Sequence, residues 1–460
     1  MIKHFMVATA MWFSINAAFP LYAQQHKDHT LGNLWPKVEE SYPGVGAKTM
    51  AIDAARFSER AVKSNMLPQV KAQGQNTYGT YEGSPGAFFP QAGFFNVSGA
   101  TNAFDGSSMT ANSFGSATLE WELFSFGKLH KENQAARALS HKAMSEKEAY
   151  LLSLKKALSE RYISLLYNGA KLKWTEKNAE RLDEIRNITS GLSAAGLRPA
   201  ADSLLASSSY NQAMGEHDKW SGLEKAAFLR LLELYGGDTV DYAVSASRFT
   251  NPIEKYPTGK AISKSHPILQ ALDQQSQYYS LSAQVQKRSS MPSLRLLGGY
   301  AYRGTGINPN GAVSDVWKDG FNNTAGNVLA GIGITWNISN LHTNGLKSKA
   351  LYKEAESTKL LHTQYGQAMQ ADLSASRAKI LHQYEQLQKT KLAVSQSREA
   401  YGMYLARYRS GIIALSELLQ IRTMLEQAEN IHIEASRDYW MLLAYEAELA
   451  ADFGFLFNNL

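Results

Sequence analysis

The chain has 460 residues, of which 44% are hydrophobic and 19% are charged, and its formal net charge is +6. It contains no cysteine, which excludes a disulfide-stabilised scaffold and an acylated N-terminal cysteine as a membrane anchor. Its basic residues are dispersed along the chain, a poor pattern for a protein that binds nucleic acid.

Residues 1–23 have the pattern of a secretory signal peptide. Lys3 precedes an apolar run over 5–19, and residues 21–23 resemble a signal-peptidase site. The run is too short for a comfortable membrane-spanning helix, and no later segment has about 18 uninterrupted apolar residues. We therefore expect an exported mature chain that begins near Gln24 and has no transmembrane helix.

Two histidines, His26 and His29, follow the expected cleavage site. Histidine is a common metal ligand, but two of them supply fewer ligands than a closed zinc site needs. No Ser/His/Asp or paired-carboxylate arrangement stands near a glycine-rich turn, as would be typical of an enzyme. We therefore expect no metal, no cofactor and no catalytic residue.

The most informative feature of the chain is an internal repeat. A helical stretch begins at Pro43 and again at Pro267, and in both cases the next proline follows after 25 residues. A β-like run, a loop and a second β-like run come next, and then a long proline-free segment that ends at Gly196 or Gly411. A duplication on this scale predicts two copies of one structural unit.

Alternation of apolar and polar residues predicts four β-strands in two hairpins. Each run is about ten residues long, which is what a tilted strand needs to cross a bilayer. We expect one set of side chains to face lipid and the other to face water. The lipid-facing set is Leu119, Trp121, Ile332, Ile334 and Trp336, and the water-facing set is Glu120, Glu122 and Thr335.

A half-buried strand of a soluble sheet is the alternative for these runs. It is disfavoured because the two hairpins lie far apart in the sequence and have no obvious companion sheet. Tryptophan near the ends of two strands also suits an aromatic belt at a membrane interface. The loops at about 81–110 and 304–325, rich in glycine and asparagine, are then the longer outer connections.

Residues 129–190 and 346–410 contain no proline and are rich in helix formers, which predicts two near-continuous helices. Apolar residues recur every seven positions in both. The two seams are Leu151, Leu158, Leu165, Leu172 and Ala179, and Leu373, Ile380, Leu387, Val394, Tyr401 and Tyr408. Because companion positions such as Ser376 and Gln383 are small or polar, we expect shallow packing of many helices rather than an ordinary two-stranded coiled coil.

Four strands do not close a barrel, and an open sheet edge in lipid leaves backbone groups without hydrogen bonds. Bacterial single-chain barrels have at least about eight strands. The chain is therefore expected to share a barrel with copies of itself, in a number that these arguments do not fix.

The order and spacing of all these elements resemble the TolC-like outer-membrane efflux proteins. The tips carry the resemblance most clearly: GLRPAADSLL begins at Gly196, RYRSGIIALSELL begins at Arg407, and in both a carboxylate lies six residues after the tip glycine. The resemblance covers the whole mature chain. It implies a mainly α-helical protein with a membrane β-barrel, in which each chain gives four strands to a shared twelve-stranded trimeric barrel above a long coiled-coil periplasmic tunnel.

For function, the resemblance implies a passive exit channel in the outer membrane of a Gram-negative bacterium, within a tripartite efflux or type I secretion system. It implies a homotrimer, opened when a periplasmic adaptor (membrane fusion) protein and an inner-membrane pump of the proton-driven or ABC type dock, and no catalytic machinery. The alternative is a soluble periplasmic coiled-coil scaffold whose hairpins pack on helices.

Site residues follow from positions in the tip pattern. Glu417 and Asp202 match acidic positions near the family's periplasmic constriction, and Tyr408 matches a tyrosine that helps to hold the entrance shut. A hydrogen bond between Tyr408 and Asp202 is the latch that this implies. The expected adaptor-docking positions are Gly196, Leu197, Gly411 and Ile412.

The sequence departs from the family pattern at two positions, and the acidic residues and glycines of the tips each have an alternative structural explanation. Gln420 stands where some members have a second carboxylate, and Ile413 where some have a latch arginine. Asp202 and Glu417 also fit solvated early-helix acids that the helix dipole favours. The tip glycines also fit simple helix C-caps.

The expected layout has four parts. They are a signal peptide over 1–23, a first repeat over 24–240 with its tip near 191–198, an equatorial linker over 241–257, and a second repeat over 258–460 with its tip near 409–413.

Overall fold

The computed structural model describes residues 30–80, 109–237, 243–252, 256, 261–262, 265–309 and 311–460. The expected signal peptide, His26 and His29 lie outside these ranges, as do nearly all of the first expected outer loop and much of the expected linker.

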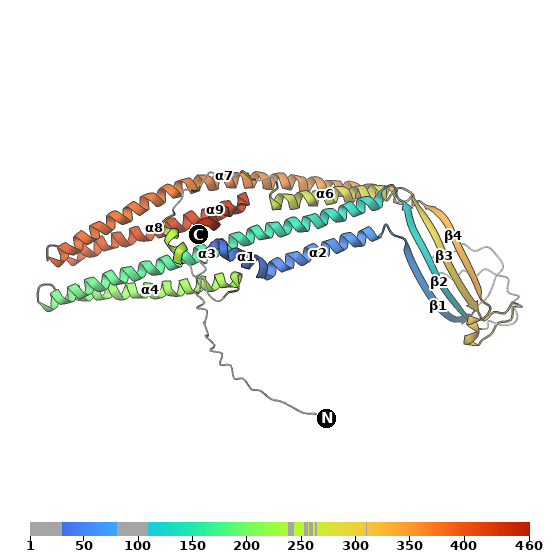
Figure 1. Cartoon of the computed structure of the whole chain (residues 1–460), viewed down its shortest axis with the longest axis horizontal. Helices are drawn as coiled ribbons and strands as arrows, with labels where there is room; N and C mark the ends of the chain where they lie inside the picture. Colours follow the sequence, from blue (N-terminus) through green and yellow to red (C-terminus); the bar gives the residue numbers. More distant parts are fainter. Residues whose placement is uncertain are drawn as a thin grey trace, which may run out of the picture.

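The described elements follow one another in two units of the same order (Figure 1). The first unit contains α2 (Pro43–Ser64), β1 (Gln69–Thr80), β2 (Met109–Phe124), α3 (Lys128–Ala194) and α4 (Ala200–Tyr235). The second contains α6 (Pro267–Arg288), β3 (Ser293–Thr305), the short 3-10 helix η1 (Trp317–Phe321), β4 (Ala325–Thr335), α7 (Asn340–Arg409) and α8 (Leu415–Ala450). Three further helices were not expected from the sequence: α1 (Leu31–Ser41), α5 (Ala243–Thr250) and α9 (Gly454–Asn459).

The two long helices are confirmed as continuous. α3 has 67 residues and α7 has 70, so each is about 100 Å long at about 1.5 Å per residue. Their seams are largely buried, with Leu158 and Leu165 on α3 and Leu373 on α7 fully inaccessible to solvent, whereas Leu172 and Val394 are half-buried. α3 packs against α2, α4, α6 and α8, whereas α7, which carries the polar companion positions, packs against α6 and α8. Within the described residues, none of the helices is both long and apolar enough to span a membrane.

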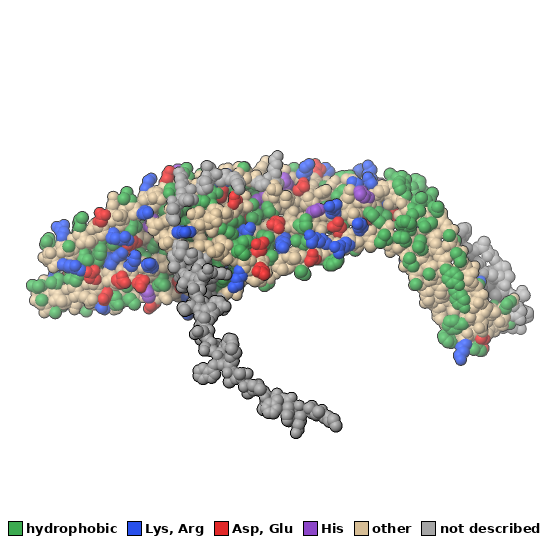
Figure 2. All heavy atoms as spheres, in the orientation of Figure 1, with side chains coloured by type: hydrophobic (Ala, Val, Ile, Leu, Met, Phe, Trp, Pro, Cys, Tyr) green, Lys and Arg blue, Asp and Glu red, His purple; other side chains and the backbone are tan. Residues whose placement is uncertain are grey.

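The four strands form one antiparallel sheet in the order β1-β2-β3-β4, which Figure 1 shows at one end of the helical shaft. Directly opposed residues share a face of a sheet. Trp121 lies opposite Leu296, which in turn lies opposite Ile332. The register thus puts Leu119, Trp121, Ile332 and Ile334 on one face and Glu120 with Thr335 on the other, while Trp336 lies just beyond the end of β4. In Figure 2, the visible face of the sheet is nearly free of charged side chains except at its far end, whereas the helical shaft carries many.

Two equivalent tryptophans tie the sheet to the helices. Trp121 Nε1 donates a hydrogen bond to the carbonyl oxygen of Met66 at 2.8 Å, and Trp336 Nε1 donates to that of Ser290 at 3.0 Å. Both carbonyls lie two residues before the proline that opens the preceding strand. Each unit therefore anchors the end of its second strand to the corner at which its first strand begins.

We expect Trp121→Phe to lower the free energy of unfolding by about 0.5–1.5 kcal/mol, because the ring is kept and one hydrogen bond is lost. Thermal unfolding of purified protein in detergent measures this change. Trp317→Phe is the control, since the exposed Trp317 ring lies in the η1 loop and packs on Phe321. Equal losses in the two variants would contradict the anchoring role.

A belt of long-range contacts surrounds the middle of the helical shaft, where Figure 1 places α1 and α9. The Leu31 backbone N–H donates to the carbonyl oxygen of Leu460 at 3.1 Å, and Trp440 Nε1 donates to that of Phe249 at 2.9 Å. His432 Nε2 lies 3.1 Å from the carbonyl oxygen of Thr250 and must donate to it, because a carbonyl only accepts. Burial also lowers the pKa of His432. Side chains of α8 thus satisfy the last carbonyls of α5.

Candidate functional site

The two tips have the same backbone geometry. Gly196 and Gly411 both have φ of +74°, in the left-handed region that glycine adopts without strain. The N–H of Leu197 donates to the carbonyl oxygen of Leu192 at 2.9 Å, and that of Ile412 donates to the carbonyl oxygen of Arg407 at 3.0 Å. These six-to-one bonds are the Schellman termination of a helix.

The caps explain why glycine stands at both tips, and they leave an apolar side chain exposed beside each one. Leu197 is 70% exposed and Ile412 is 65% exposed, although both are large aliphatic residues. The two positions are equivalent in the repeat. The C-cap interpretation and the docking interpretation are therefore compatible, because the cap presents the side chain that would dock.

Arg198 crosses from the first tip to the second. Its guanidinium donates to the carbonyl oxygen of Ile413 at 2.6 Å and to that of Gly411 at 3.3 Å. It also lies over the ring of Tyr408, 5.5 Å from the centroid. Ile413, which departs from the latch-arginine pattern, is buried. The sequence analysis did not single out Arg198, although it lies two residues after Gly196.

Tyr408 is fully buried, and its hydroxyl lies 3.0 Å from Thr189 Oγ1. Thr189 Oγ1 donates its proton to the carbonyl oxygen of Ile185 at 2.7 Å, so Tyr408 is the donor to Thr189. Within one protomer, the structure therefore brings Tyr408 together with Thr189 and not with Asp202. The physical reason is that Tyr408 continues the buried seven-residue seam of α7.

Asp202 and Glu417 lie in the first turns of α4 and α8. Asp202 is half-buried and Glu417 is exposed, and within the described ranges neither carboxylate forms an ion pair. Both positions are favourable for an acid at a helix N-terminus, as the helix-dipole alternative requires. The structure therefore leaves the Glu417 carboxylate accessible to solvent and uncompensated at the tip end of the protomer.

Farther from the tips, a buried carboxylate joins three helices. Glu429 of α8 is 7% exposed and accepts two hydrogen bonds from Arg181 of α3, at 2.8 and 2.7 Å. Arg398 of α7 donates a third at 3.0 Å. Burial alone would raise the pKa of Glu429, but the two guanidinium groups hold it below its usual value. This network was missed by the sequence analysis, because its members lie far apart in the chain.

No group of three or more His, Cys, Asp or Glu side chains is placed to hold a metal ion in the part of the chain that the structure describes. The larger of two open depressions has a volume of about 940 Å³ and lies between α2, α3, α6 and α7. Its lining mixes both charge signs with aliphatic side chains and includes His141 and His362.

Solved structures with the same fold are outer-membrane channels. The channel CusC has a TM-score of 0.75 and 13% identity over 92% of each chain. VceC from Vibrio cholerae has a TM-score of 0.68 and 14% identity, over 92% of this chain and 96% of that one. MtrE from Neisseria gonorrhoeae has a TM-score of 0.66 and 17% identity, over 92% of this chain and 89% of that one. At these identities, the likeness shows the fold. No curated protein matches the chain.

The sequence itself matches a family described as outer membrane efflux protein over residues 35–237 and 260–441. The two matched segments include the helices and strands of the first and of the second unit, except the last part of α8. The expected mainly α-helical class with a membrane β-barrel, and the expected location in the outer membrane, are thereby confirmed. Because the matched segments make up most of its length, the chain belongs to the outer membrane efflux protein family.

Proposed function

We propose that three copies of this chain form a passive exit channel that a periplasmic adaptor opens on docking and that an inner-membrane pump supplies. The two repeats, over 24–240 and 258–460 with the linker over 241–257 between them, would each give one hairpin to the barrel and one to the tunnel. The observation that carries the proposal is that the protomer is an open layer with two unpaired edges.

The sheet has one edge at β1 and the other at β4. In lipid, an unpaired edge leaves a row of N–H and C=O groups without partners, which is why membrane sheets close into barrels. Pairing β4 of one copy with β1 of the next satisfies both edges. Three copies with four strands each supply twelve strands, within the range of known outer-membrane barrels.

The helices have matching edges. α2 and α4 both pack on α3 and form one side of the layer, whereas α7 forms the other side along its whole length. Both sides expose large apolar side chains. On α7 these include Leu346, Tyr352, Leu360, Leu361, Tyr365, Leu392 and Met403, and on α2 and α4 they include Met50, Phe57, Leu204, Leu223 and Leu229.

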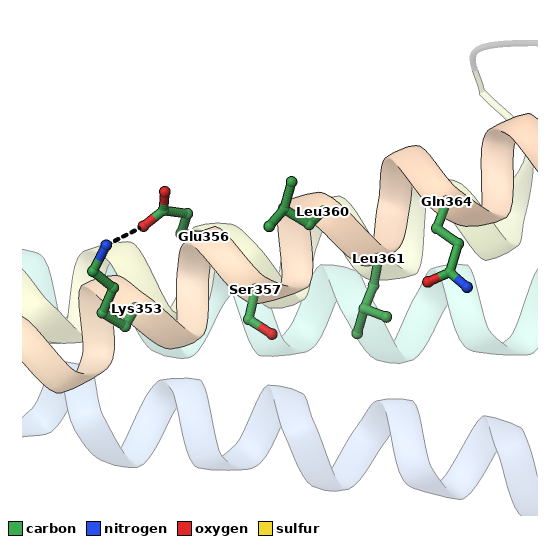
Figure 3. Close-up of a pocket in the computed structure, with 6 residues that line it drawn as sticks. All are labelled: Lys353, Glu356, Ser357, Leu360, Leu361 and Gln364. Carbon is green, nitrogen blue, oxygen red and sulfur yellow. Dashed lines mark hydrogen bonds and ion pairs between the residues drawn. The ribbon is translucent and has the colours of Figure 1, made fainter.

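Figure 3 shows one stretch of the α7 edge, a shallow depression of about 370 Å³. Leu360 and Leu361 line it, and Lys353 pairs with Glu356 at 2.7 Å beside them. An apolar strip with charged pairs at its side is typical of a subunit interface. The two edges differ from each other, so copies associate head to tail, which gives a closed ring when the rotation closes.

The soluble scaffold is not favoured, because it would leave one apolar sheet face in water. Val328, Ile332 and Ile334 are 82%, 68% and 75% exposed in the protomer. Membrane fractionation separates the two functions. The channel remains with the outer membrane after high-salt washing, whereas release of the protein by that wash would contradict the proposal.

The proposed docking surface consists of the tips with Gly196, Leu197, Gly411 and Ile412. Its support is the pair of exposed apolar side chains at equivalent capped turns. We expect affinity-tagged protein, cross-linked in its native host, to recover an adaptor and a pump. The double variant Leu197→Asp and Ile412→Asp should remain trimeric and lose both. Recovery equal to that of the parent would rule out these tips as the docking surface.

Glu417 and Asp202 are proposed to line the constriction, and the buried Tyr408 to hold it shut from inside the protomer through its hydrogen bond to Thr189. In a trimer, three Glu417 carboxylates would face one another across a narrow aqueous mouth. A ring of like carboxylates attracts cations, so we expect a cation-selective pore despite the net positive charge of the chain. A multivalent cation should block the pore, and should do so more weakly in high salt because the attraction is screened.

Planar-bilayer recording tests this ring. Glu417→Ala should lower cation selectivity and relieve the block. The control Glu216→Ala, at an exposed glutamate of α4 that pairs with Lys219, should change neither. Tyr408→Phe should leave selectivity unchanged and raise the open conductance, because it removes a hydrogen bond between α7 and α3. If Glu417→Ala behaves like the parent, Glu417 does not line the constriction.

A further inference from the structure

One side chain fixes the two tips of a protomer to each other. Arg198 follows Leu197 directly in the first tip, and the two carbonyls to which it donates, those of Gly411 and Ile413, flank Ile412 in the second. The Arg198 side chain therefore links the backbone next to Leu197 to the backbone on both sides of Ile412.

The chemistry of this contact is specific to arginine. A planar guanidinium carries two N–H groups on each terminal nitrogen, and here the Nη2 atom of Arg198 donates to both carbonyl oxygens while the guanidinium lies near an aromatic ring. Here the ring is that of Tyr408, which is itself immobilised by burial and by its hydrogen bond to Thr189. A lysine at position 198 would keep the charge and lose the planar guanidinium and its fixed N–H directions.

Other polar contacts between the two hairpins start farther back from the tips. They include the hydrogen bond of Tyr408 to Thr189 and an ion pair of Arg409 with Glu184. These contacts hold the helices, but the turns extend beyond them. Arg198 makes polar contacts between the turns themselves, in addition to the apolar packing of Ile413.

We propose that Arg198 is a positioning residue for adaptor docking, which holds Leu197 and Ile412 at one fixed separation. The proposal rests on the docking function given above. A preformed pair of apolar side chains spares the partner the entropy cost of ordering two separate turns. The partner that fits is an apolar surface of the adaptor, since both exposed residues are aliphatic.

The first test measures the separation directly and needs no partner. The chain has no cysteine, so Ala195→Cys with Ser410→Cys places spin labels at two exposed, repeat-equivalent positions. Labelled protomers are diluted among unlabelled ones in full-length trimers, and double electron–electron resonance gives the distance distribution. We expect one narrow distance in the parent and a broadened distribution in Arg198→Ala and in Arg198→Lys.

Arg407→Ala is the matched control. It removes an exposed arginine from the same end of the protomer, one that stacks on Tyr404 of its own helix. The distance should stay narrow in this variant. An equally narrow distance in Arg198→Ala would overturn the proposal, whatever the adaptor does.

The second test measures binding of the purified adaptor that is recovered with the parent protein. Arg198→Ala should weaken binding about tenfold, because the partner must then order the two turns itself, while the trimer still assembles. Arg407→Ala should bind like the parent. Broadened distances with unchanged binding would overturn the positioning role. A parent that recovers no adaptor would instead refute the docking function, and the distance measurement would still decide whether Arg198 ties the tips.

Discussion

Replacing Glu429 with alanine is expected to lower the free energy of unfolding by about 3 kcal/mol, because it leaves the buried charge of Arg181 without an anionic partner. The Glu429 carboxylate accepts two hydrogen bonds from Arg181, whose side chain is only 15% exposed. The free-energy cost at Arg398 is smaller, since its side chain is 59% exposed and water can hydrogen-bond its guanidinium in place of the carboxylate. The cost therefore falls mainly on Arg181, which would lie between α3 and α8 without an anion.

The same carboxylate gives stability a defined pH dependence. The pKa of Glu429 is lower in the folded chain than in the unfolded chain, so the unfolded state takes up a proton first as pH falls. The contribution of Glu429 is fully present above the usual glutamate value of about 4.3 and is lost as pH falls through the lowered folded value. Glu429→Gln removes this part of the acid sensitivity, so its unfolding free energy should depend less on pH below about 5.

Denaturant unfolding of purified protein, followed by helical circular dichroism, measures both effects. Glu146→Ala is a suitable control, because Glu146 forms an exposed i,i+4 pair with Lys142 on the same helix as Arg181. Exposed pairs of this kind contribute little. A Glu429→Ala variant as stable as the control would show that the two arginines find solvent or other partners.

The elements that the sequence predicted well are those with local causes. Proline spacing marked the ends of α2 and α6, and the seven-residue seams marked the buried faces of α3 and α7. Alternation along β2 and β4 assigned opposite faces to Trp121 and Glu120, and the register agrees. The tip glycines were located because a helix that turns back needs a residue with positive φ, which both have.

What the sequence did not predict depends on contacts between distant segments. α5 has eight residues, and its last carbonyls are satisfied by His432 and Trp440 of α8, nearly two hundred positions away. No local pattern encodes such a belt. Arg198 was missed for the same reason, since its acceptors belong to the other repeat.

The expected latch stays a prediction, since within one protomer the Tyr408 hydroxyl is bonded to Thr189 instead. Tyr408 is the last member of the seam that begins at Leu373, and a seam position places its side chain inside the protomer. Its bond to Thr189 follows from that burial. A hydrogen bond to Asp202 would have required the same side chain to reach outward to α4.

Lysine substitutions in β4 test which face of the sheet contacts lipid. We expect Ile332→Lys to cost about 2–4 kcal/mol per protomer, because a charge on the lipid face near mid-bilayer loses its hydration. Ile334→Lys should cost less than Ile332→Lys, since Ile334 lies closer to Trp336 and the expected interfacial belt, and the penalty falls with distance from the midplane. Thr335→Lys, on the opposite face across from Ser293, should cost little.

The ordering of these three variants carries more information than any one of them. Every trimer contains three copies, so the lipid-face penalty acts three times in the assembled channel and should appear as loss of outer-membrane trimer. If the two strand faces were both solvated, as in a soluble sheet, all three lysines would be tolerated alike. If the faces were reversed, Thr335→Lys would be the damaging variant. Only a lipid-facing Ile332 and Ile334 with a water-facing Thr335 gives the graded order, and equal amounts of Ile334→Lys and Thr335→Lys trimer would overturn the assignment.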